Sequence, residues 1–146
     1  MSKTQSIKII STAPFFTMAI LMILSNVAAE ECKTINIISG NGLSRATVMV
    51  KPDILSIAKG ECVVWANRTR VGDVRIKFEG EKNCEAYVTA LSGFALDPDS
   101  GCYIVDRLKP GGTASVAFKA EGMYHYVVEF DFAPTRRVYG KIGVIK

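Results

Sequence analysis

Apolar residues alternate with polar ones in short runs that follow one another along most of the chain. In one run Val116 and Phe118 are two residues apart, and the next run repeats this spacing at Tyr124, Tyr126 and Val128. Successive side chains of an extended chain point to opposite faces, so each set shares one face, and we expect the two faces to meet in the core. The pattern predicts strands at 34–38, 46–50, 54–57, 62–65, 74–78, 113–118, 123–130 and 141–145.

Glycine and proline residues separate several of these runs, as is typical of hairpins and Greek-key connections. They cluster at 39–42, 51–53, 59–60, 109–112 and 121–122. Short strands at this spacing predict an all-β fold, a Greek-key antiparallel β-sandwich. The segment 82–107 breaks the strand rhythm, and we expect a long covered loop there with one helical turn near 84–91.

The first 29 residues have the features of a cleavable signal peptide. Lys3 and Lys8 make a basic start, an apolar stretch covers 14–24, and small residues occupy 27–29. A retained membrane anchor is the alternative, but spanning a bilayer takes roughly 20 apolar residues. We therefore expect an exported protein, periplasmic or secreted, with one domain at 30–146 and no stable membrane span after cleavage.

The charge balance changes once the signal peptide is set aside. The signal holds two of the 18 Lys and Arg residues and none of the 14 Asp and Glu residues, which leaves 16 basic and 14 acidic residues. A nucleic-acid-binding domain usually combines clustered basic residues with a recognisable motif. Neither is present, so nucleic acid is not an expected partner.

All four cysteines lie after the signal peptide, and an even number in a small exported domain favours disulfides. We favour a Cys84–Cys102 pair because it closes the irregular segment, which leaves Cys32 and Cys62 for each other. The other two connectivities remain open. A zinc site built from thiolates is a further alternative.

Two blocks of the sequence resemble the cupredoxins, the small blue-copper proteins. Residues 48–67 read as a strand, a proline turn, a strand, Lys-Gly, and a strand that ends in Trp65-x-Asn67. The later block covers 109–118, 122–126 and 139–144. The resemblance implies a copper-binding sandwich that transfers electrons, and Tyr124 suits a tyrosine corner at a Greek-key crossing.

The copper chemistry that this resemblance implies is missing. The family holds copper with two histidines, a cysteine and a methionine. The two histidine positions carry over to Asp73 and Asp131, the cysteine position to Val128 and the methionine position to Val138. The chain's only histidine is His125, which strand alternation places on the outer face. A blue-copper centre needs two imidazoles, so we expect no copper site and no cofactor.

Two loops match those that flank the copper end of the sandwich in cupredoxins, and both are rich in arginine. They hold five of the seven arginines in the chain: Arg68, Arg70, Arg75, Arg136 and Arg137. In one interpretation they form surface ion pairs with Asp73, Glu129 and Asp131. In the other they bind an acidic or anionic partner, because guanidinium groups bind carboxylates bidentately. A calcium site between Asp73 and Asp131 is a third possibility with only two ligands.

The Asn67-Arg68-Thr69 triplet matches the N-glycosylation pattern, but Asn67 is also the expected strand-end residue, and we prefer this structural role. The sequence shows no Gly-x-Ser-x-Gly elbow, phosphate-binding loop or metal triad, so no enzyme is predicted. We expect a copper-free binding or assembly module whose partner is another exported protein or an anionic surface. The alternative is a periplasmic electron carrier with an atypical metal site.

Overall fold

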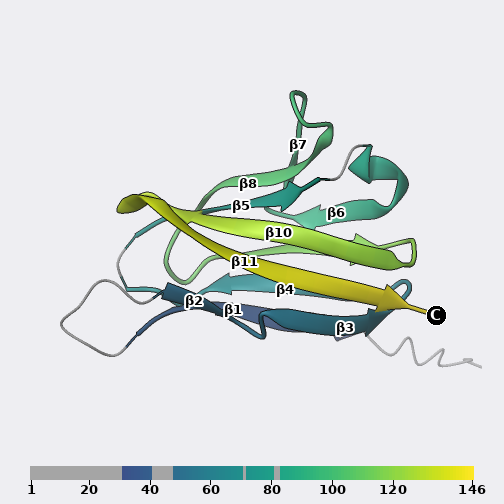
Figure 1. Cartoon of the computed structure of the whole chain (residues 1–146), viewed down its shortest axis with the longest axis horizontal. Helices are drawn as coiled ribbons and strands as arrows, with labels where there is room; N and C mark the ends of the chain where they lie inside the picture. Colours follow the sequence, from purple (N-terminus) through teal and green to yellow (C-terminus); the bar gives the residue numbers. More distant parts are fainter. Residues whose placement is uncertain (1–30, 41–47, 71, 81–82) are drawn as a thin grey trace, which may run out of the picture.

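The computed structural model describes residues 31–40, 48–70, 72–80 and 83–146, so the predicted signal peptide lies outside the described residues. Its elements form two facing β-sheets (Figure 1). In chain order they are β1 (Lys33–Ser39), β2 (Val48–Lys51), β3 (Ile54–Ala58), β4 (Cys62–Asn67), β5 (Val74–Glu79), the 3₁₀ turn η1 (Cys84–Ala86), β6 (Val88–Ser92), β7 (Ala95–Asp97), β8 (Cys102–Leu108), β9 (Thr113–Phe118), β10 (Gly122–Phe130) and β11 (Ala133–Ile145). In this part of the chain, no helix has the length and apolar character needed to cross a membrane.

The two sheets are mixed, which corrects the prediction of an antiparallel sandwich. One has the strand order β2-β1-β4-β9-β6, and the other has the order β3-β11-β10-β5-β8-β7. Strand β4 runs parallel to β1, and β11 runs parallel to β3, while the other pairs are antiparallel. The reason is that β2 and β3 are consecutive in sequence but belong to different sheets. The chain therefore returns to the first sheet at β4 in the direction of β1.

The segment 82–107 is mostly strand, so the prediction of a covered loop was wrong. It contains β6, β7 and the first six residues of β8. A β-bulge between β5 and β8 disturbs the alternation, and the buried residues of β8 are Cys102, Val105 and Leu108, three apart rather than two. The predicted helical turn is present but short, as η1. The predicted Cys84–Cys102 and Cys32–Cys62 disulfides are both formed.

The core lies between the two sheets and is rich in aromatic side chains. The ring of Trp65 in β4 lies 5.4 Å from that of Tyr126 in β10 and 5.3 Å from that of Phe94, measured between centroids. Phe118 in β9 lies 4.8 Å from Tyr124, so the predicted meeting of these two strand faces is confirmed. The Tyr124 hydroxyl donates a hydrogen bond to the Ala120 carbonyl at 2.9 Å, which confirms the tyrosine corner.

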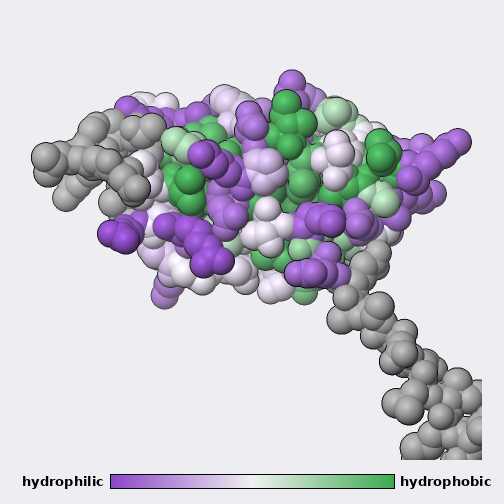
Figure 2. All heavy atoms as spheres, turned by 90° about the horizontal axis from the view of Figure 1, so that it is seen from below, coloured by the Kyte–Doolittle hydropathy of each residue, from purple (hydrophilic) through white to green (hydrophobic). Residues whose placement is uncertain are grey.

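The surface outside this core mixes polar and apolar residues, as the view from below shows (Figure 2). Some large apolar side chains remain exposed, among them Ile54, Tyr139 and Ile145. Scattered exposed apolar residues are normal on a folded domain. The functional features must therefore be sought in the arrangement of charges and at the end of the sandwich where the resemblance places copper.

Candidate functional site at the closed end of the sandwich

The long β10–β11 hairpin occupies the place where the resemblance puts a ligand-bearing loop. The two strands stay paired as far as Glu129 and Arg137, and an irregular step follows at Phe130 and Ala133. Within this pairing Val128 lies directly opposite Val138. Val128 is fully buried and Val138 is half-buried against the core. The positions carried over from the copper cysteine and methionine are therefore neighbouring apolar residues in a regular hairpin.

Aromatic side chains close the end of the sandwich beside this pair. Phe130 is buried, and its ring lies 5.6 Å from that of Phe132 at the hairpin turn. Phe132 in turn lies over Gly72 in the β4–β5 connection, where a Cβ atom would come within 3.3 Å of Phe132 Cδ1. Both segments lie at the left end of the molecule in Figure 1. We call Val128, Phe130, Phe132 and Val138 the apolar plug.

Asp73 and Asp131, the positions carried over from the two copper histidines, are neighbours through their backbones. Their carboxylates do not share a partner. The backbone N–H of Asp131 donates to the Asp73 carbonyl at 3.2 Å. The Asp73 carboxylate pairs with Arg107 Nε at 3.3 Å, whereas Asp131 is exposed. No group of three potential metal-ligand side chains occurs in the described part of the chain, so the calcium possibility gains no support.

The chain's single histidine lies away from the plug. His125 in β10 is exposed and faces Glu79 on one neighbouring strand and Lys141 on the other. This confirms the outward position that strand alternation predicted. The residues at this end offer two apolar side chains and two carboxylates where copper needs imidazoles and a thiolate, so they do not fit a blue-copper centre.

Asn67 ties three segments of the closed end together. Its side-chain amide donates to the Gly72 carbonyl at 3.1 Å and to the Leu108 carbonyl at 2.8 Å. Its carbonyl oxygen accepts from the Thr69 N–H at 3.0 Å and from the Thr69 hydroxyl at 2.7 Å. The side chain is fully buried, so the folded domain presents no amide for a glycan. The geometry therefore supports the structural role expected for Asn67 at the end of its strand, in preference to a role as a glycosylation site.

The structure divides the five predicted arginines between different surfaces. Arg75 and Arg137 lie on the outer face of the six-stranded sheet, on either side of Glu129. Arg68 lies toward the other sheet, where its Nε donates to Asn36 Oδ1 at 3.2 Å. The remaining two, Arg70 and Arg136, are exposed and form no ion pair or hydrogen bond with any described residue.

Lys109 belongs with this second group, although the sequence interpretation did not include it. It is exposed in the β8–β9 turn, which hydrogen bonds between Asn67 and residues 111–112 hold at the same end. The sequence predicts the Lys-Pro-Gly-Gly run to be a turn, but it does not show that this turn lies beside Asn67. Lys109 therefore could not be assigned to this end from the sequence. We call Arg68, Arg70, Lys109 and Arg136 the cationic end. Its residues lie in segments that end at the same end of the sandwich as the apolar plug.

The other arginines line an open groove of about 450 Å³ on the sheet face. Glu129 pairs here with Arg137, as the ion-pair interpretation expected, whereas Asp73 pairs with Arg107, which is not among the five arginines of that interpretation. Glu129 accepts from Lys77 Nζ at 3.2 Å and from Arg137 Nε at 3.3 Å. Surface pairs of this kind each contribute about 0–1 kcal/mol to stability.

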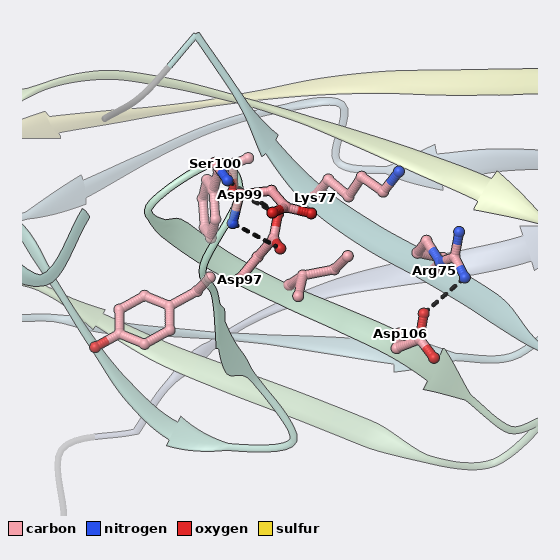
Figure 3. A pocket seen from close by; sticks show the side chains of 9 residues that line it. Arg75, Lys77, Asp97, Asp99, Ser100 and Asp106 are labelled. Carbon is pink, nitrogen blue, oxygen red and sulfur yellow. Dashed lines mark hydrogen bonds and ion pairs between the residues drawn. The ribbon is translucent and has the colours of Figure 1, made fainter. Parts of the chain in front are cut away.

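A second groove of about 420 Å³ adjoins the first and shares Arg75 and Lys77 with it (Figure 3). Here Arg75 pairs with Asp106 at 2.6 Å. The Ser100 hydroxyl donates to Asp97 at 2.7 Å and lowers the pKa of that carboxyl. Cations and carboxylates thus alternate across the outer face of this sheet.

Comparison with known proteins gives no matching protein-family model and no matching curated protein. Solved structures do match. An oxidised methionine-to-lysine mutant of amicyanin has a TM-score of 0.46 and 17% identity, over 78% of this chain and 82% of that one. The Cu(I) form of a methionine-to-alanine amicyanin mutant has a TM-score of 0.46 and 18% identity, over 82% of this chain and 87% of that one.

A purple cupredoxin from Nitrosopumilus maritimus has a TM-score of 0.45 and 22% identity, over 77% of this chain and 99% of that one. Each of these structures is similar to this chain at low sequence identity. The structural neighbours of this all-β sandwich of two mixed sheets are amicyanin and other cupredoxins, in agreement with the resemblance found in the sequence.

Proposed function

We propose that the chain is an exported, copper-free cupredoxin-like binding module whose cationic end binds an acidic surface of another exported protein. The observation that carries the proposal is the combination of the apolar plug with the cationic end. Among the described residues the carboxylates at this end are Asp73, Glu129 and Asp131, and the first two are already paired with Arg107 and with Lys77 and Arg137. The four residues of the cationic end therefore exceed the carboxylates available to neutralise them.

The chemistry of these cations favours carboxylate groups as ligands. Arg70 and Arg136 are exposed and have no ion-pair partner among the described residues, so their guanidinium donors are available. Guanidinium groups bind carboxylates through two parallel hydrogen bonds, which gives orientation as well as affinity. Phe132 and Val138, two partly buried members of the apolar plug, add apolar area at the same end. An apolar centre with a polar rim is the usual composition of a protein–protein interface.

Export is part of the proposal, and the cysteines support it. Both disulfides join residues of the folded domain, and they tie β4 to the chain before β1 and η1 to β8. Disulfides persist in oxidising compartments and are rare in the reducing cytosol. A periplasmic or secreted location therefore suits the domain, and the signal peptide predicted at residues 1–29 would supply the route.

Affinity capture from the exported proteome tests the proposed surface. The purified protein is immobilised, and its captured partners are compared with those of an Arg70→Ser/Arg136→Ser variant. The matched control is Lys59→Ser/Lys146→Ser, which removes the same charge from exposed residues near the C-terminal end of β11. We expect the first variant to lose a captured acidic protein and the control to keep it. Equal capture by all three proteins would contradict the proposal.

A second experiment distinguishes a protein partner from an anionic surface. Binding of the purified protein to a polyglutamate peptide and to vesicles of anionic phospholipid is measured with the same variants. Loss of peptide binding in the Arg70→Ser/Arg136→Ser variant supports carboxylate recognition. Binding to vesicles alone would overturn the choice of a protein partner.

A further inference from the structure

We propose that the outer face of the six-stranded sheet binds a second copy of this chain in a two-fold symmetric dimer. The sheet has the order β3-β11-β10-β5-β8-β7, so its centre lies between β10 and β5. A two-fold axis that runs along the strands at this centre places β10 over β5 of the second copy, and β11 over β8 of the second copy. Such an interface is self-complementary, because each patch meets its own rotated image.

A row of four charges crosses these four central strands with alternating sign: Arg137 in β11, Glu129 in β10, Arg75 in β5 and Asp106 in β8. Glu129 lies directly opposite both arginines in the sheet, and Arg75 pairs with Asp106 (Figure 3). The proposed axis turns this row end for end. Arg137 then faces Asp106 of the second copy, and Glu129 faces Arg75 of the second copy, so every charge meets its opposite.

The next row along the strands is mostly apolar and matches itself in the same way. It holds Tyr139, Val127, Lys77 and Ile104, in the same strand order. Under the axis, Tyr139 faces Ile104 of the second copy, while Val127, at 3% exposed, is already covered within its own chain and adds no contact area. Tyr139 is 55% exposed although it is large and apolar, so a second copy would cover it. This contact adds apolar burial to the charge match.

The third row also avoids like-charge contacts. His125 lies between Lys141 and Glu79 in the sheet, and the axis brings it over Glu79 of the second copy. Arg107 lies on the same bulge as Asp106, but it is turned toward Asp73 and is neutralised there. Three successive rows are thus compatible with one axis. A different partner would need the same alternating pattern, whereas a second copy supplies it by symmetry.

The size of this face predicts a weak dimer. Six strands about 4.8 Å apart and about 20 Å long give roughly 500 Å² of projected area per copy. A standard protein–protein interface buries about 800 Å² of surface on each partner, which is more than this face offers. Charged contacts at such an interface are screened by salt. The dimer is therefore expected at micromolar concentration and low ionic strength. The cationic end lies at the strand ends and stays free in it.

Sedimentation of the purified protein tests the dimer. We expect association at low salt and dissociation near 1 M salt, where the Debye length falls to about 3 Å. Arg137→Glu and Asp106→Arg each create two like-charge contacts per dimer and should weaken association at least about tenfold. Both side chains are exposed, at 55% and 75%, so the variants can fold as the parent does, and circular dichroism verifies this.

Mixing the two variants gives the sharpest result. In a mixed dimer the two reversed charges face each other at one contact and the parent pair is kept at the other, so the mixture should associate about as tightly as the parent, although each variant alone associates at least about tenfold more weakly. The control is a charge reversal outside the three rows, Glu121→Lys, which should leave association unchanged. The proposal is overturned if the parent stays monomeric at every salt concentration, if either single variant dimerises as tightly as the parent, or if the mixture associates no more tightly than the single variants.

Discussion

Single side chains fix the closed end of the sandwich, and Asn67 has the largest share of that role. Its amide bonds reach the β4–β5 connection at Gly72 and the end of β8 at Leu108. The plug residue Phe132 rests on the same Gly72. The position of the plug and of the cationic end therefore depends on one buried amide. Its importance follows from its hydrogen bonds, which the sequence pattern indicated only as a strand end.

Replacing this amide by a carboxylate should therefore be costly. Asn67→Asp replaces the buried NH2 group by a single oxygen that faces the carbonyls of both Gly72 and Leu108, and we expect a loss of about 3 kcal/mol in the free energy of unfolding. Urea unfolding measures it. Asn36→Asp is the control, since its oxygen still accepts from Arg68 at the surface. Equal losses in both variants would show that Asn67 has no special role.

Tyr126 gives a pH-dependent prediction at the same scale. Burial in the core raises the pKa of its phenol, and the neighbouring Trp65 indole offsets part of the rise. Above pH of about 10 the unfolded chain ionises this group while the folded chain keeps its proton, so stability is lost as pH rises, by up to about 1.4 kcal/mol per pH unit.

The Tyr126→Phe variant lacks this group, so its stability should fall less steeply between about pH 10 and pH 11 than that of the parent. Denaturant unfolding at several pH values measures both slopes. The other tyrosines and the lysines titrate equally in the two proteins and cancel in the comparison. Parallel curves would mean that Tyr126 titrates with its ordinary pKa in the folded state.

At the scale of strands and hairpins, alternation predicted well where the two faces differ clearly. The predicted strands at 54–57, 62–65, 74–78 and 113–118 all correspond to observed strands. The strands β6 and β7 were missed because they are short edge strands with exposed residues, and β8 because of its bulge. The first part of β11 was missed too, since 133–140 reads as a polar loop after a proline.

The candidate site was predictable to a similar degree. The misfit of these residues to a blue-copper centre follows from residue identity alone, because one histidine cannot supply two ligands. Alternation could also have placed Arg75 outward, since Val74 and Ile76 on either side are buried. The plug depends on the hairpin register that sets Val128 opposite Val138. A loop of altered length leaves that register open in the sequence, so only the structure fixed it.

The same hairpin register supplies a prediction about packing. Gly140 lies opposite Tyr126, and a Cβ atom on it would overlap the tyrosine ring. Gly140→Ala should therefore lower the free energy of unfolding by about 1–3 kcal/mol, the usual cost of overpacking. Gly143→Ala is the matched control in the same strand, where the new atom meets Met123 Cε at an ordinary 3.5 Å. Thermal unfolding of both variants measures the difference, and a neutral Gly140→Ala would refute the close contact.

At the scale of the whole molecule, the sandwich combines a well-stabilised core with one end whose residues do not fit a blue-copper centre. Two disulfides, the tyrosine corner and the aromatic core stabilise the sandwich independently of any metal. The end that would hold copper contains the apolar plug together with the residues of the cationic end. Fold alone does not determine function, so the residues at this end decide it. For this reason we propose binding rather than electron transfer.

Copper titration of the purified protein, followed by visible absorption and electron paramagnetic resonance, tests this central claim most directly. The ligand positions hold Val128, Val138 and two aspartates, which offer no thiolate or imidazole. We predict that copper(II) produces no intense thiolate-to-copper band and that any copper bound gives the spectrum of weak surface coordination. An intense blue or purple band that saturates at one copper per chain would contradict the account.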